Sequence, residues 1–397
     1  MKPALDRASR ADGFYDRGGE TNPTERLRAV QVSRSSRALI ESLDDPSPEV
    51  ARAAVRRIEE IGGPSAADAL RARLLTADLS LVADMAKALR RIGDRRAVDL
   101  AIAGLTGEPY TRRLAAARAL GALADTRATF MLRIALQDAV AGVRVAALDA
   151  LAEIGRATDE AGACARLLSD PNPQVRVAAV RAVSRIAGQP GKVLSSLAQD
   201  PDRSVRLEVA RHVATLSDQA AGALLADRDL RVREAAARAG GMRQVGPLAV
   251  LLVDDPGADV RRAAASTLGG LGDPRIAEVL VPGIEDPDAV VRAAVLRALV
   301  QLVMRGGAVR RLRHELASDR PERRSASVYA LAHLEAFEAA EDVTRLVDDP
   351  DPDVRLALIH TARSLAPDPG ALVRRLRDDR DAAVRGSAEV WLLRRPA

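Results

Sequence analysis

One pattern of residues recurs along almost the whole chain of 397 residues: Asp-Pro, three variable residues, Val-Arg, one variable residue and Ala-Ala. The clearest copy runs from Asp170 to Val183. With the Val of the pattern as a marker, twelve copies follow one another about 31 residues apart, at Val50, Leu81, Arg112, Val143, Val175, Val205, Val232, Val260, Val291, Arg323, Val354 and Val384. This period predicts a solenoid, because each repeat can bury its apolar side only by stacking on its neighbours.

Each repeat has the residues of two helices joined by a tight turn. Aspartate caps helix N-termini and proline fits the first helical turn, so we expect a second helix to begin at each Asp-Pro. Alanine recurs three residues after the marker, as in Ala178 and Ala263, and its small side chain lets neighbouring helices approach closely. We predict an all-α fold, an α-α superhelix of about twelve helical-hairpin repeats. It would form one solenoid over residues 24–397, after a disordered tail at residues 1–23.

Composition narrows the class of protein further. Cys164 is the single cysteine, so a disulfide framework within one chain is excluded. No apolar run approaches the ~20 residues of a membrane-spanning helix, and the first twenty residues lack the apolar stretch of a signal peptide. We therefore expect a cytoplasmic protein with no membrane partner. The four histidines lack the spacing of a metal motif and no phosphate loop is present, so we expect no metal, no cofactor and no enzymatic activity.

Aspartate and arginine recur six residues apart. We interpret them as a structural ladder, in which each arginine bridges to an aspartate within or between repeats, rather than as anion-binding residues. The planar guanidinium suits such pairing because it can donate two parallel hydrogen bonds to a carboxylate. The pairs are Asp138 and Arg144, Asp170 and Arg176, Asp200 and Arg206, Asp227 and Arg233, Asp255 and Arg261, Asp286 and Arg292, Asp349 and Arg355, and Asp379 and Arg385.

The repeat pattern, together with the loop Leu271 to Arg275 (Leu-Gly-Asp-Pro-Arg), resembles HEAT repeats of the short kind also found in phycobilin lyases. The resemblance covers roughly residues 24 to 395. It implies a right-handed superhelix of antiparallel helix pairs whose second helices line the concave face. It also implies the usual roles of such proteins as scaffolds, adaptors and partner-binding platforms.

A stripe of cations is predicted on this inner face, six residues after the marker. If that position faces the groove, the stacked helices place these charges in a track along it. The stripe consists of Arg56, Lys87, Arg118, Arg181, Arg211, Arg238 and Arg297, and it is interrupted by other residues such as Asp149. The alternative is a solvated face without a partner, since the net charge is only +5.

Three functions follow from these features. The leading hypothesis is a non-enzymatic scaffold or adaptor that binds a partner protein with an acidic surface in the groove. The second is a nucleic-acid-binding protein that uses the same cations on phosphates. The third is an enzyme resembling the phycobilin lyases, which would need a cavity for a tetrapyrrole.

Overall fold

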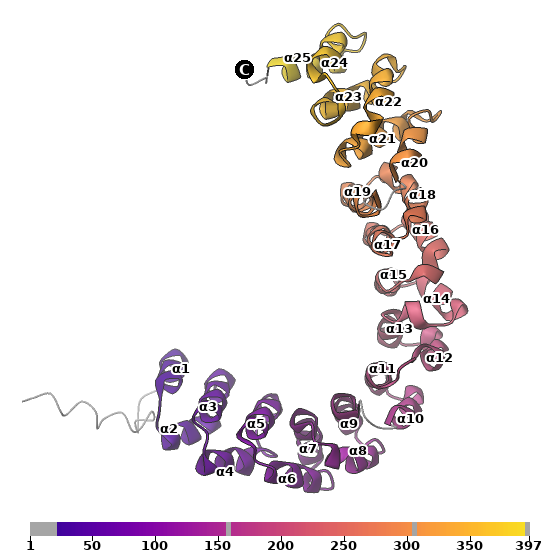
Figure 1. Cartoon of the computed structure of the whole chain (residues 1–397). Helices are drawn as coiled ribbons and strands as arrows, with labels where there is room; N and C mark the ends of the chain where they lie inside the picture. The colour runs from indigo at the N-terminus through magenta and orange to yellow at the C-terminus, as the bar shows by residue number, and fades with distance from the viewer. Residues whose placement is uncertain (1–21, 156–159, 304–307, 394–397) are drawn as a thin grey trace, which may run out of the picture. The chain divides into compact units, whose positions relative to one another are not determined.

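The computed structural model describes residues 22–155, 160–303 and 308–393 (Figure 1). In these ranges the chain forms α-helices and short 3-10 turns, and no strand. The all-α solenoid predicted from the repeats is confirmed. The predicted tail at residues 1–23 lies outside the described residues, apart from its last two, of which Pro23 begins the first helix.

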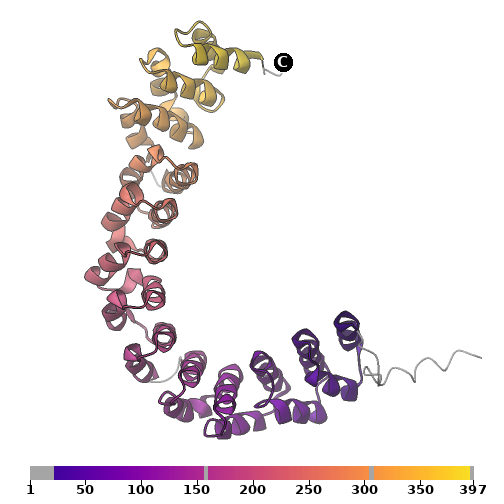
Figure 2. The same ribbon diagram turned by 180° about the vertical axis from the view of Figure 1, so that it is seen from behind.

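The chain divides into two compact units, with the boundary between Pro190 and Gly191. In unit 1 the helices alternate between two layers, which Figures 1 and 2 show from opposite sides. The odd-numbered layer contains α1 (Pro23–Val32), α3 (Pro48–Ile61), α5 (Leu79–Ile92), α7 (Tyr110–Leu123), α9 (Ala141–Ile154) and α11 (Pro173–Ile186). The even-numbered layer contains α2 (Ser36–Glu41), α4 (Pro64–Arg73), α6 (Arg96–Gly104), α8 (Thr129–Ala135) and α10 (Glu160–Ala165).

Unit 2 repeats the arrangement of unit 1. Its odd-numbered helices are α13 (Arg203–Ala210), α15 (Leu230–Arg238), α17 (Ala258–Gly270), α19 (Ala289–Val303), α21 (Pro321–His333), α23 (Pro352–Leu365) and α25 (Ala382–Leu393). Its even-numbered helices are α12 (Gly191–Leu194), α14 (Asp218–Leu225), α16 (Val245–Asp254), α18 (Ala277–Leu280), α20 (Ala308–Glu315), α22 (Ala340–Thr344) and α24 (Pro369–Leu376). All twelve repeat markers lie in odd-numbered helices, from α3 to α25.

Where Asp-Pro precedes an odd-numbered helix, the helix begins two residues after the proline, later than expected. In the repeat of Asp170, the helix α11 begins three residues later, and its N-cap is Asn172, whose side chain accepts the N–H of Gln174. Asp170 itself accepts the N–H of Asn172 at 2.9 Å. The prediction that this aspartate caps the helix was wrong, because its side chain closes the turn that precedes the cap.

Packing within each layer depends on small residues. The markers Val143 and Val175 are fully buried, and neighbouring odd-numbered helices contact one another along their lengths. A Cβ on Gly121 would lie only 3.1 Å from the Cα of Ala150, so α7 and α9 are too close for a larger residue there. Because each odd-numbered helix packs on the next one in this way, the layer offers one continuous surface within a unit.

Candidate functional site

In many repeats the marker is followed by an arginine, and the best buried example reaches two loops at once. In α13, Nε and Nη2 of Arg206 donate to the two carboxylate oxygens of Asp227 at 2.7 and 3.2 Å. Its Nη1 donates to the main-chain oxygens of Asp200 and Pro201 at 2.9 and 3.2 Å. The side chains of Arg206 and Asp227 are 7% and 6% exposed. Arg206 therefore joins the loop before its own helix to the loop of the following repeat.

The contact to the carboxylate recurs in both units. The arginine donates two hydrogen bonds of 2.6 to 3.2 Å to the aspartate of the following repeat in Arg26 and Asp45, Arg113 and Asp138, Arg144 and Asp170, Arg233 and Asp255, Arg261 and Asp286, Arg324 and Asp349, and Arg355 and Asp379. The aspartate six residues before an arginine instead offers its main-chain oxygen, as Asp170, Asp286 and Asp379 do to Arg176, Arg292 and Arg385. The carboxylate contact thus joins successive repeats, and the main-chain contact stays within one repeat.

Three of these pairs were absent from the sequence-based ladder. They are Arg26 with Asp45, Arg113 with Asp138 and Arg324 with Asp349, and in none of them does an aspartate precede the arginine by six residues. A search for an arginine next to the marker followed by Asp one repeat later would have found the pairs of Arg113 and Arg324, but not that of Arg26, which lies before the first marker. The pair of Arg26 and Asp45 also shows that α1 extends the odd-numbered layer before the first marker.

Pairing changes the acidity of the ladder aspartates. Hydrogen bonds from Arg355 hold the pKa of Asp379 below its ordinary value, although burial acts in the opposite direction. For Asp227, burial raises the pKa. The hydrogen bonds from Arg206 and from the main chain lower it by more than burial raises it, so the pKa of Asp227 is below its ordinary value. These carboxylates are therefore held in the charged form by the fold.

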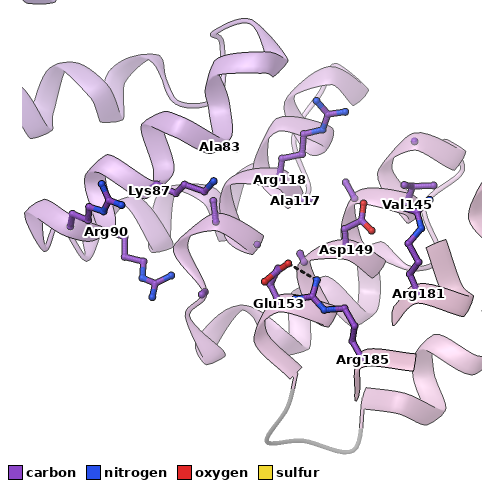
Figure 3. A pocket seen from close by; sticks show the side chains of 17 residues that line it. Ala83, Lys87, Arg90, Ala117, Arg118, Val145, Asp149, Glu153, Arg181 and Arg185 are labelled. Atoms are coloured by element: carbon purple, nitrogen blue, oxygen red, sulfur yellow. Dashed lines mark hydrogen bonds and ion pairs between the residues drawn. The ribbon is translucent and has the colours of Figure 1, made fainter. Parts of the chain in front are cut away.

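The clearest candidate for a binding surface is a groove in unit 1. It has a volume of about 790 Å³ and crosses the odd-numbered helices α5, α7, α9 and α11 (Figure 3). We call it the odd-layer groove. Much of its lining is small, which leaves space between the larger side chains: Ala83, Ala117, Gly121, Ala122, Ala124, Gly142, Ala146 and Ala150.

The odd-layer groove carries more positive than negative charge. Its lining includes the six cations Lys87, Arg90, Arg91, Arg118, Arg181 and Arg185, and the two acids Asp149 and Glu153. Nη1 of Arg185 pairs with Oε1 of Glu153 at 2.6 Å (Figure 3). Arg91 pairs with Glu59, which lies outside the groove. Over residues 22–155, 160–303 and 308–393, Lys87 and Arg90 have no ion-pair partner. The ammonium group of Lys87 and the guanidinium group of Arg90 are therefore available to a ligand.

Asp149 lies among these cations, but its pKa shifts in the opposite direction to those of the ladder aspartates. Burial of its carboxyl raises the pKa, while the charges of Arg181 and Arg118 lower it, and the outcome is a raised pKa. In the part of the chain that the structure describes, Asp149 has no ion-pair partner within salt-bridge distance. Arg118 uses Nη1 to donate to the main-chain oxygen of Leu79 at 3.3 Å.

The structure brings only part of the predicted stripe together. Lys87, Arg118 and Arg181 share the odd-layer groove, whereas Arg56 is exposed on α3 outside its lining. In unit 2, Arg211 pairs with Glu208 and Arg238 pairs with Glu234 on the same surface, and Arg297 is exposed on α19. Sequence reasoning missed Arg90, Arg91, Arg185 and Glu153. They lie three or four residues beyond the stripe, a spacing that puts them on the same helical face.

Other reactive side chains lie apart from the groove. Burial raises the pKa of the Cys164 thiol to about 12, with a further contribution from Glu160, so the thiol stays protonated at neutral pH. The stripe positions of α21 and α23 are Tyr329 and His360, whose Oη and Nδ1 are 2.7 Å apart. Among the described residues no group of three or more His, Cys, Asp or Glu side chains is placed to hold a metal ion. None of the described helices has the length and apolar character needed to cross a membrane.

Sequence comparison accounts for this architecture. A family model of HEAT repeats matches residues 36–121, 160–241 and 245–332, which together are more than half of the chain. The chain belongs to the HEAT-repeat family. The resemblance seen in the repeat pattern is thereby confirmed. No curated protein matches this HEAT-repeat sequence.

Importin beta and Kap121p share the fold of this HEAT-repeat protein at low sequence identity. Importin beta, crystallised in an ammonium sulfate condition, is 12% identical with a TM-score of 0.52, over 93% of this chain and 64% of that chain. Kap121p bound to Pho4p is 13% identical with a TM-score of 0.51, over 91% of this chain and 47% of that chain. The Escherichia coli protein YIBA is 20% identical with a TM-score of 0.47, over 73% of this chain and 99% of that chain. This HEAT-repeat chain thus spans about half the length of Kap121p.

Proposed function

We propose that this protein is a non-enzymatic scaffold that binds a partner protein through the odd-layer groove, and that the partner presents an acidic surface or segment there. The observation that supports the proposal most directly is the charge of the groove, with six cations against two acids. Kap121p bound to Pho4p is a case in which a solenoid of similar fold holds a protein. Lys87 and Arg90 would meet carboxylates of the partner, because neither is neutralised within the described chain.

The affinity of such a complex would come from several modest contacts. An exposed ion pair contributes about 0.2–1 kcal/mol, so no single cation could hold a partner alone. The groove spans four repeats, which allows the contacts of one partner segment to add. Because these charges are exposed to solvent, salt would weaken the complex.

Charge reversal within the groove tests the proposal. We expect the triple variant Lys87→Glu, Arg118→Glu and Arg181→Glu to lose the proteins that the wild type retains from a nuclease-treated extract of its own cells, because three attractive contacts become repulsive. The measurement is affinity capture with quantitative mass spectrometry. Circular dichroism melting would verify that the variant folds.

A matched variant distinguishes the effect of the groove residues on capture from the effect of the protein's net charge. Lys192, Arg310 and Arg374 are exposed cations on the even-numbered helices α12, α20 and α24, and none has an ion-pair partner among the described residues. The triple change of these residues to glutamate alters the net charge equally and is expected to leave capture intact. Equal loss in both variants, or in neither, would contradict the proposal.

Nucleic-acid binding is the second candidate, because the exposed Lys87 and Arg90 could equally meet phosphates. It predicts an affinity for DNA or RNA that falls by roughly one power of the salt concentration for each phosphate contacted. Gel shifts at physiological salt with the same two triple variants distinguish it from the scaffold. The lyase-like alternative remains a prediction from the resemblance alone.

A further inference from the structure

Two rows of side chains cross the odd-layer groove, and both rows have their acid on the same helix. The first row lies six residues after the marker and contains, on α5, α7, α9 and α11 in turn, Lys87, Arg118, Asp149 and Arg181. The second row lies ten residues after the marker and contains Arg91, Ala122, Glu153 and Arg185. Figure 3 shows the cations of α5 on one side of the two acids and those of α11 on the other. The groove is thus positive, then negative, then positive along the stacking direction.

The two acids differ in how far they are neutralised. Glu153 is paired with Arg185 at 2.6 Å. Asp149 lies on α9, between the helices of Arg118 and Arg181, and has no direct ion-pair partner in the described ranges. A ligand that follows the first row therefore meets a carboxylate without a direct ion pair in the middle of a cationic track.

A ligand of uniform negative charge is poorly matched to this row. Two like charges about 4 Å apart repel by roughly 1 kcal/mol in water and by more where protein displaces the water. A polyanion lying along Arg118 and Arg181 would bring such a charge to Asp149. A basic side chain at that point would be attracted instead, and would share the carboxylate with the flanking arginines.

We infer that the partner segment is an extended peptide of alternating charge, with acidic residues over α5, α7 and α11 and a basic residue over Asp149 on α9. The inference rests on the function proposed above and specifies its ligand. Neighbouring stacked helices lie roughly 8–10 Å apart. A chain in the extended polyproline II conformation has three residues per turn and advances about 3.1 Å per residue, so that side chains three residues apart face the same side. One peptide side chain in three would therefore meet each successive helix, which gives the order acid, acid, base, acid at every third position. Asp149 is the residue that selects for this order.

Two synthetic peptides test the inference on the full-length protein. The first carries glutamate, glutamate, lysine and glutamate, each separated by two glycine or serine residues, and a fluorescent label. The second replaces the lysine by glutamate. By fluorescence anisotropy we expect the wild type to prefer the lysine peptide by about fivefold, the upper end of the range for one exposed charge contact. Asp149→Asn should abolish or reverse this preference, because the neutral amide no longer repels the added glutamate.

Glu278→Gln supplies the matched control, because Glu278 is an exposed acid on α18, outside the groove, and has no ion-pair partner among the described residues. It should keep the wild-type preference. If both peptides bind equally well, or the all-acidic peptide binds better, the inference is wrong while binding in the groove still stands. If neither peptide binds, the inference is also wrong, and the capture experiment with the groove variants decides separately whether the scaffold proposal survives.

Discussion

At the scale of single residues, the contact between two successive repeats depends on one arginine that donates hydrogen bonds to both of them. Arg206 supplies two N–H groups to the carboxylate of Asp227 and one to the main chain of Asp200. Its replacement by alanine would leave the carboxylate of Asp227 buried, with the N–H of Asp229 as its remaining hydrogen-bond donor in the described contacts. We expect Arg206→Ala to lower the free energy of unfolding by about 3 kcal/mol, because it would leave the charge of Asp227 buried without the arginine that compensates for its lost hydration. Urea titration would measure the change.

Arg345→Ala is the control for this prediction. Arg345 also pairs with an aspartate, Asp342 at 3.2 Å, but its side chain is 73% exposed. A pair so open to solvent contributes less than about 1 kcal/mol. If Arg206→Ala destabilised the protein no more than Arg345→Ala does, the proposed structural role of the ladder would fail.

At the scale of elements, the approach of neighbouring odd-numbered helices sets which side chains fit between them. A Cβ on Gly269 of α17 would lie 2.4 Å from the Cβ of Ala298 on α19 and 2.7 Å from its Cα. Gly270, the next residue, has no neighbouring atom within 4 Å of such a Cβ. We expect Gly269→Ala to lower the free energy of unfolding by about 1–3 kcal/mol, because the two helices would have to separate.

Gly270→Ala provides the comparison within the same helix. Alanine favours the helix by up to about 1 kcal/mol over glycine, so this variant should be neutral or slightly more stable. Thermal and urea unfolding of the two single variants would measure the difference. Equal stability of the two variants would show that α17 and α19 are not held at this close approach.

At the scale of the whole molecule, the recurring aspartates make stability depend on pH. Asp138, Asp227 and Asp379, drawn from both units, have pKa values below the ordinary 3.8. A carboxyl whose pKa is lower in the folded chain than in the unfolded chain stabilises the fold above the unfolded pKa, and this contribution is lost as the pH falls through the folded value. We therefore expect the melting temperature to be steady near neutral pH and to fall once the pH drops below about 4.

Removal of one arginine should reduce this dependence on pH. In Arg355→Ala the pKa of Asp379 would lose its main cause of lowering, so the variant should be less stable at neutral pH and should lose less on acidification. Melting temperatures by circular dichroism between neutral pH and pH ~3 would test both expectations. A wild-type melting temperature that does not change below pH ~4 would contradict them.

The helices and their order follow from features that can be read along the chain. The repeat period, the apolar markers and the alanines are local properties of the chain, and each odd-numbered helix from α3 to α25 contains one marker. The local geometry of the turn was less certain. Asp170 was expected to cap α11, but Asn172 does so, because aspartate can close a turn as readily as it caps a helix.

Which side chains meet depends on how the repeats stack in three dimensions. Arg144 pairs with Asp170, 26 residues away, rather than with Asp138, six residues away, because the stacking of repeats brings the next loop within reach of its guanidinium. The groove has the same origin. Lys87, Asp149 and Arg181 lie on separate helices of unit 1, and whether such residues share a surface depends on how closely those helices pack, which no residue specifies alone.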